Sequence, residues 1–161
     1  MSAVSLGIYT IRGAQSSLDD LVAINLAQEG LEGVRWLRDS NWKNDINWDN
    51  GIIGPTVYTV GRMEVNNPQE SVPFEYNILP AGETWQEYCV LCFDDQSDSY
   101  FHIDSGSSCE EEGYKDSGYS RLLVARKYSN PGSPERLMVG SIVYQGAKEY
   151  ALFEEFYDWW P

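Results

Sequence analysis

The sequence has one histidine, few basic residues and no long apolar run, and each shortage excludes a class of protein. A helix needs about 18 or more consecutive apolar residues to cross a membrane, and no such run is present. Residues 1–7 also lack the basic segment followed by an apolar one that marks a secretory signal. We therefore expect a cytoplasmic protein, or one from which a signal has been removed, with no membrane partner.

The scarcity of histidine and cysteine argues against catalysis and metal binding. His102 would have to serve any Ser-His-Asp or Cys-His group, yet it stands between two residues expected to face inward from a strand. We therefore expect His102 to lie on the surface, and the protein to be no enzyme and to need no cofactor. Cys89 and Cys92 form a lone C-x-x-C in an apolar run, and Cys109 makes the count odd. This pattern predicts buried thiols, and neither a disulfide framework nor a zinc site.

The charge is strongly acidic, with 25 acidic against 11 basic residues and a net charge of −14. Such a chain repels phosphate backbones, which argues against a nucleic-acid partner, and it attracts basic partners. With 161 residues, 42% of them hydrophobic, the chain is long enough for a single domain, 1–161, with a real core.

Short runs of β-branched and aromatic residues, separated by turn residues, predict an all-β protein. They are 7–12, 21–26, 34–38, 57–63, 72–78, 88–93, 100–103, 121–127, 137–144 and 150–156. The best alternative is a helix over 17–31, but Gly30 and Gly33 punctuate the chain soon afterwards and favour the strand.

Three of these runs carry an aromatic and an aliphatic residue two positions apart, which places both on one face of a strand. The pairs are Tyr9 and Ile11, Tyr58 and Val60, and Phe101 and Ile103. Their recurrence at roughly 40–50 residues indicates threefold internal symmetry. A closed barrel of three such units leaves no exposed strand edge, so the pattern predicts a β-trefoil.

Long connections at 39–55 and 104–119 interrupt the pattern, and such segments are often functional. Trp42 and Trp48 lie among asparagine and aspartate in the first of them, where they would stack on a sugar or anchor a protein interface. Alternatively, both fold back over the end of the barrel. A glycan-binding lectin and an acidic protein that occupies a basic surface are therefore open alternatives.

Three stretches resemble the mycocypins, mushroom cysteine-protease inhibitors of the clitocypin and macrocypin type. They are 6–12 (LGIYTIR), 72–76 (VPFEY) and 150–155 (YALFEE). The resemblance implies a β-trefoil that blocks papain-like proteases with loops of its first unit and, in some members, legumain with an asparagine in a later loop. It makes protease inhibition the favoured function and a protease the expected partner.

On this resemblance, Asn66 or Asn67 would be the legumain-directed residue, although an Asn-Pro turn explains Asn67 and Pro68 equally. The papain-directed loops would be 13–17, with Gly13, Gln15 and Ser16, and 28–33, with Gly30 and Gly33. Small residues let a backbone enter a narrow cleft, but both loops are shorter than those of that family.

Overall fold

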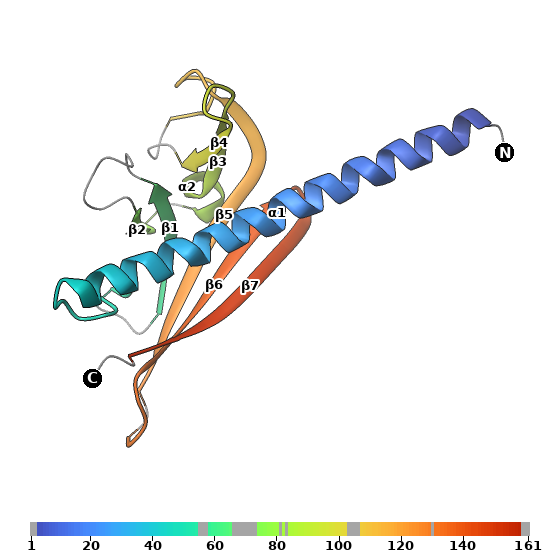
Figure 1. The fold of residues 1–161 in the computed structure, drawn as a ribbon. Helices are drawn as coiled ribbons and strands as arrows, with labels where there is room; N and C mark the ends of the chain where they lie inside the picture. The colour runs from blue at the N-terminus through green and yellow to red at the C-terminus, as the bar shows by residue number, and fades with distance from the viewer. Residues whose placement is uncertain are drawn as a thin grey trace.

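A computed structural model describes residues 3–54, 58–65, 74–80, 82, 84–102, 107–129 and 131–158, and shows one long helix lying across one antiparallel sheet (Figure 1). The elements are α1 (Ala3–Lys43), β1 (Tyr58–Val65), β2 (Phe74–Ile78), α2 (Trp85–Tyr88), β3 (Val90–Asp94), β4 (Ser99–His102), β5 (Lys115–Tyr128), β6 (Arg136–Gln145) and β7 (Lys148–Tyr157). Among the described residues, most elements are therefore strands.

The sheet is organised around β5, the longest strand. One edge of β5 pairs with β6 along its length, and β6 pairs in turn with β7. The other edge is shared, because β3 pairs with the first half of β5 and β1 with the second. β2 and β4 complete the sheet beside β1 and β3. The described strands form an open sheet of seven.

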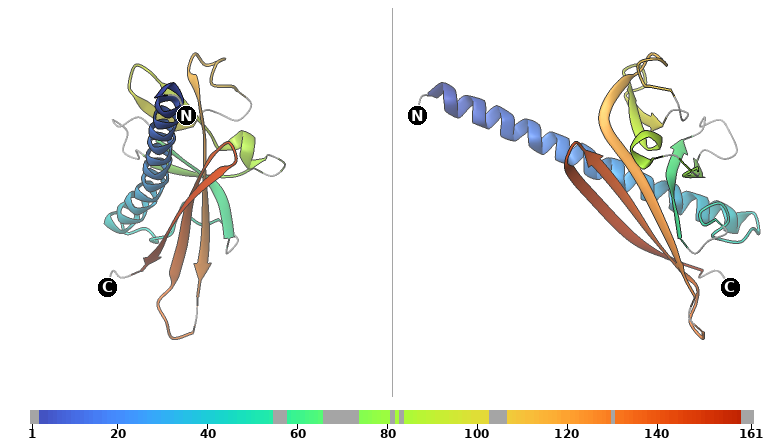
Figure 2. Two further views of the ribbon diagram at one scale, coloured as in Figure 1. Left: turned by 90° about the vertical axis from the view of Figure 1, so that its right-hand side faces the viewer. Right: turned by 180° about the vertical axis from the view of Figure 1, so that it is seen from behind.

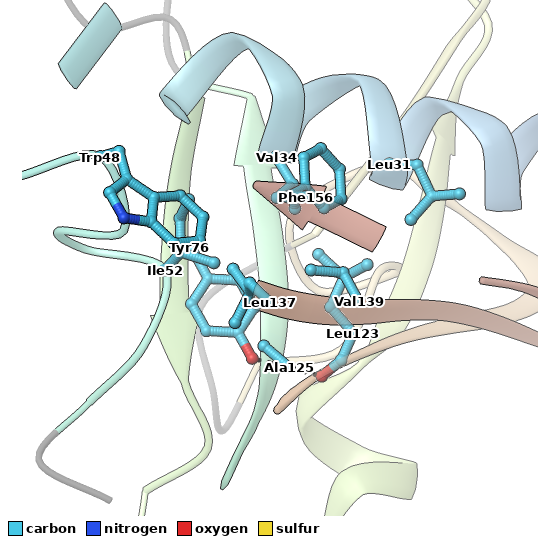
Figure 3. Packing of buried hydrophobic residues seen from close by; sticks show 10 residues of the cluster. All are labelled: Leu31, Val34, Trp48, Ile52, Tyr76, Leu123, Ala125, Leu137, Val139 and Phe156. Carbon is cyan, nitrogen blue, oxygen red and sulfur yellow. Dashed lines mark hydrogen bonds between the residues drawn. The ribbon is translucent and has the colours of Figure 1, made fainter. Parts of the chain in front are cut away.

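The core lies between α1 and one face of this sheet. Buried positions alternate along β6, at Leu137, Val139, Ser141 and Val143, as expected for a strand with one covered face. Figure 3 shows ten buried residues that join α1, the segment after it and the strands: Leu31, Val34, Trp48, Ile52, Tyr76, Leu123, Ala125, Leu137, Val139 and Phe156. Burying a side chain of this size contributes about 1.5–3 kcal/mol, so this contact fixes α1 on the sheet.

The second half of α1 is helical because its apolar residues recur with helical spacing. Ala23, Leu26, Ala27, Leu31 and Val34 are all buried, and the i, i+3, i+4 spacing from Ala23 onward aligns them on one side of a helix. The predicted strands at 7–12, 21–26 and 34–38 are therefore wrong, and the helix considered over 17–31 lies within α1.

The remaining strand predictions are confirmed, with shifted boundaries, in the described parts of β1 to β7. The coarse expectation of a mostly β protein therefore holds for the described residues after α1. The β-trefoil is not confirmed, because the first of its three units is helical and the sheet is not closed.

Two expectations about single side chains are wrong. Cys92 and Cys109 form a disulfide that ties β3 to the turn before β5, so these two thiols are not free. Cys89 alone is a buried free thiol, and burial raises its pKa to about 12. His102 is not a plain surface residue, since its Nδ1 lies 2.9 Å from the carbonyl oxygen of Val90 and burial lowers its pKa well below the usual value.

Candidate self-association surface

The helix α1 has two parts with different surroundings. Its second half lies on the sheet, whereas its first turns extend beyond the sheet and touch no other element, as two views show (Figure 2). Residues 7–15 are exposed on every side of the helix. We call residues 3–15 the arm. At 1.5 Å per residue, the arm projects by about 20 Å.

Polar contacts fix the base of the arm to the hairpin of β6 and β7. Lys148 Nζ lies 2.7 Å from Asp20 Oδ1 and donates to Ser16 Oγ at 3.0 Å, and the hydroxyl of Tyr150 donates to Asp20. The hydrogen bonds from Lys148 and Tyr150 hold the pKa of Asp20 below its usual value. The helix therefore leaves the sheet at Ser16.

Buried and half-buried ion pairs anchor the docked half. Arg121, which is only 1% exposed, donates through Nη1 to the carbonyl oxygen of Leu26 at 3.2 Å and lies 3.4 Å from Glu29. Arg35 donates through Nε to Glu154 on β7 at 2.8 Å. These contacts define the orientation of α1, and hence the direction in which the arm points.

The arm and the adjoining outer side of α1 expose large apolar side chains that nothing in the described chain covers. They are Ile8, Tyr9, Ile11, Leu18, Leu21 and Ile24. Ile11 is 71% exposed and Leu18 is 58% exposed. Single exposed apolar residues are ordinary, but a group along one projecting helix is typical of an interaction surface. We call these six residues the apolar arm surface.

The glycines of α1 distinguish the arm from the docked half. A side chain at Gly30 would place Cβ 2.6 Å from Ser141 Oγ and 3.2 Å from Leu123 Cδ2, so glycine there lets the helix approach the sheet closely. At Gly7 and Gly13, no atom lies within 4 Å of the corresponding position. A glycine inside a helix costs about 1 kcal/mol relative to alanine, and the described chain offers no compensating contact for these two.

The distribution of charge also sets the arm apart. All 25 acidic residues lie from Asp19 onward, and Arg12 is the single charged residue among the first 18. The arm is thus slightly basic on an otherwise acidic molecule. An approaching copy is repelled by most of this surface and least by the arm.

The structure separates the residues predicted to bind a papain-like protease. Gly13, Gln15 and Ser16 lie at or next to the arm, whereas Gly30 and Gly33 are buried against the sheet. All five belong to α1, so the two predicted loops do not exist. Asn66 and Asn67 lie outside the described residues.

The two tryptophans considered for sugar stacking fold back onto the core. Trp48 is 2% exposed and belongs to the core cluster, so it offers no stacking surface. Trp42 packs beside that cluster, with the Arg38 guanidinium 4.7 Å from its ring centre. Both tryptophans therefore fold back, as in the alternative, but onto the core between α1 and the open sheet and not over the end of a barrel.

Sequence reasoning missed the arm, although its signals were present. An acid-free stretch of 18 residues and two glycines among branched apolar residues mark the N-terminal segment. Within the described residues, no group of three or more histidine, cysteine, aspartate or glutamate side chains is placed to hold a metal. In the same part of the chain, no helix is both long and apolar enough to span a membrane. Comparisons with protein-family models, curated proteins and solved structures find no match.

Proposed function

We propose that this protein is an assembly subunit, which associates with further copies of itself through the arm. The observation that carries this proposal is the projecting part of α1 with its uncovered apolar side chains. The sheet and the docked half of α1 act as the body that holds the arm in a fixed direction.

The composition of the arm supports a packed state over an isolated one. The arm continues the docked half of α1 and needs no new nucleus, but most helical stability in proteins comes from packing, which the arm lacks within the described chain. The arm contains Gly7 and Gly13 together with the β-branched Ile8, Thr10 and Ile11, all of which disfavour helix relative to alanine. Contacts with a neighbouring helix would supply the missing stability and would use the space beside the glycines.

A second copy is the partner that the charge favours. An acidic molecule of charge −14 repels its own copies unless they meet where acids are absent, and the arm is such a place. When the arm of one copy contacts a different region of the next copy, the contact can repeat from copy to copy. Such contacts generate rings or open chains of subunits.

The test compares the parent chain with the double substitution Ile11→Glu and Leu18→Glu. Both side chains are mostly exposed, so the fold should survive, while two buried carboxylates would oppose packing of the arm. Sedimentation velocity over a concentration series should show the parent associating and the double variant monomeric. Ile46→Glu, at a residue of comparable character that is exposed outside the arm, is the matched control and should associate like the parent.

A parent chain that stays monomeric at about 1 mM would contradict the proposal, because its association would then be weaker than about 4 kcal/mol. The proposal would also be contradicted if the parent and the arm variant associate while the Ile46→Glu control does not. In that case the copies meet through the body of the protein.

Protease inhibition, which the mycocypin resemblance implies, remains a separate prediction. It rests on Asn66 and Asn67, which lie outside the described residues, because the residues expected to form the papain-directed loops are helical. Glycan binding and occupation of a basic surface likewise remain predictions. The self-association proposal does not depend on any of the three.

A further inference from the structure

The single charge on the arm has no ion-pair partner among the described residues. Arg12 is exposed, and the described residues place no carboxylate within ion-pair distance of it. A long, charged side chain on an apolar projecting helix is well suited to recognise a carboxylate on whatever packs beside it.

A suitable carboxylate lies one heptad further along the same helix. Asp19 is the first acid of the sequence, it is half-buried at the base of the arm, and no ion pair involves it in the described part of the chain. Its neighbour Asp20 is already engaged by Lys148 and Tyr150. Asp19 therefore remains available for an ion pair, whereas Asp20 does not.

The surroundings of Asp19 favour a cation. The hydroxyl of Tyr119 donates to the backbone carbonyl oxygen of Asp19 at 3.3 Å, and burial together with the negative charge of Asp19 raises the pKa of Tyr119. Asp98 adds a second negative charge near Tyr100. A guanidinium that reaches Asp19 would therefore gain ion-pair attraction.

We propose that Arg12 of one copy binds Asp19 of a neighbouring copy, and that this ion pair sets the register in which the arms pack. Arg12 and Asp19 are seven residues apart, so they lie on nearly the same line of the helix, separated by about 10 Å. A neighbour displaced by that amount along the helix brings the two residues level, and it also brings Ile11 level with Leu18. This inference rests on the proposed self-association and names its specificity-determining contact.

The experiment reverses each charge and then exchanges them. Arg12→Glu should weaken association about tenfold or more, because it places like charges together. Asp19→Arg should do the same, and the double variant Arg12→Glu with Asp19→Arg should regain most of the parent's association. Lys43→Glu makes the same charge change at the exposed far end of α1, and it should weaken association only slightly, through the change in net charge, and far less than Arg12→Glu does.

A cross-linking measurement tests the contact directly. When Arg12→Cys protein is mixed with Asp19→Cys protein under mild oxidation, the cross-linked product should contain one chain of each kind. The native cysteines do not interfere, since Cys92 and Cys109 are joined and Cys89 is buried. Circular dichroism and thermal unfolding should show that each variant is folded.

The failures of the two proposals are distinguishable. A parent chain that does not associate removes the proposed function. Suppose instead that the parent associates, that the exchange variant associates as weakly as the single variants, and that no mixed cross-link forms. This result overturns the Arg12–Asp19 contact alone.

Discussion

At the scale of single residues, replacing two glycines of α1 by alanine should have opposite effects on stability. Gly30→Ala would force a methyl group against Ser141 and Leu123, and such overpacking costs about 1–3 kcal/mol, more than the gain in helix propensity of about 1 kcal/mol. Chemical denaturation should therefore show a less stable protein. Gly13→Ala meets no atom within 4 Å, so it should raise the helical circular-dichroism signal without lowering the unfolding temperature.

Association distinguishes the two variants further. If copies approach closely at Gly13, the added methyl group should weaken association even though the single chain gains helix. A Gly13→Ala variant that associates more tightly than the parent would show that the glycine is not used for close approach. Gly30→Ala serves as the comparison, because its effect should appear in stability first.

These glycines also explain why the helix was not predicted. Gly30 and Gly33 were interpreted as the end of an element, whereas both are buried within α1, and at Gly30 close contact with the sheet requires a small residue. The alanines Ala23 and Ala27 carry part of the helical period but contribute little to a hydrophobicity pattern. Tertiary packing against β5 and β6 thus decides the conformation of a segment whose local sequence is ambiguous.

At the scale of elements, the strands were predictable and the helix was not. The runs in β5, β6 and β7 combine β-branched and aromatic residues with a period of two, which no helix uses. The segment 7–12 shows the same composition but projects from the fold, where its apolar residues have no strand to pair with. The candidate site was missed for the same reason, since its residues were assigned to strands and loops of the first trefoil unit.

The contact between α1 and the β6–β7 hairpin should respond to acid. Because the folded-state pKa of Asp20 is lowered, the contact contributes stability above the unfolded pKa of about 4 and loses it as the pH falls through the folded value. The unfolding temperature of the parent should exceed that of Asp20→Asn at neutral pH, and the two should converge as the pH falls below the folded-state pKa of Asp20. Lys148, Tyr150 and the neighbouring Asp19 are the charged and titratable groups around this site.

Thermal unfolding across this range measures the effect. Glu112→Gln, in an exposed turn away from α1, provides the control and should track the parent at every pH. A constant difference between Asp20→Asn and the parent down to low pH would show that the stabilisation comes from the shape of the side chain and not from its charge.

At the scale of the whole molecule, the Cys92–Cys109 disulfide joins β3 to the turn that precedes β5. It closes a loop of sequence separation 17, for which the loss of chain entropy in the unfolded state predicts about 3 kcal/mol of stability. Such bonds persist in oxidising compartments, so the disulfide and the cytoplasmic location expected from the N-terminal residues make opposite predictions about the thiols.

Thiol titration and denaturation test this bond together. The native protein should show no reactive thiol, because Cys89 is buried and burial keeps its pKa near 12, while the denatured protein without reductant should show the thiol of Cys89 alone. Cys92→Ser with Cys109→Ser should lower the free energy of unfolding by about 3 kcal/mol. Reductant should destabilise the parent to the same degree and leave the double variant unchanged. A parent in which all the thiols titrate after denaturation without reductant would show that the bond does not form, and a reducing compartment would then fit the chain better.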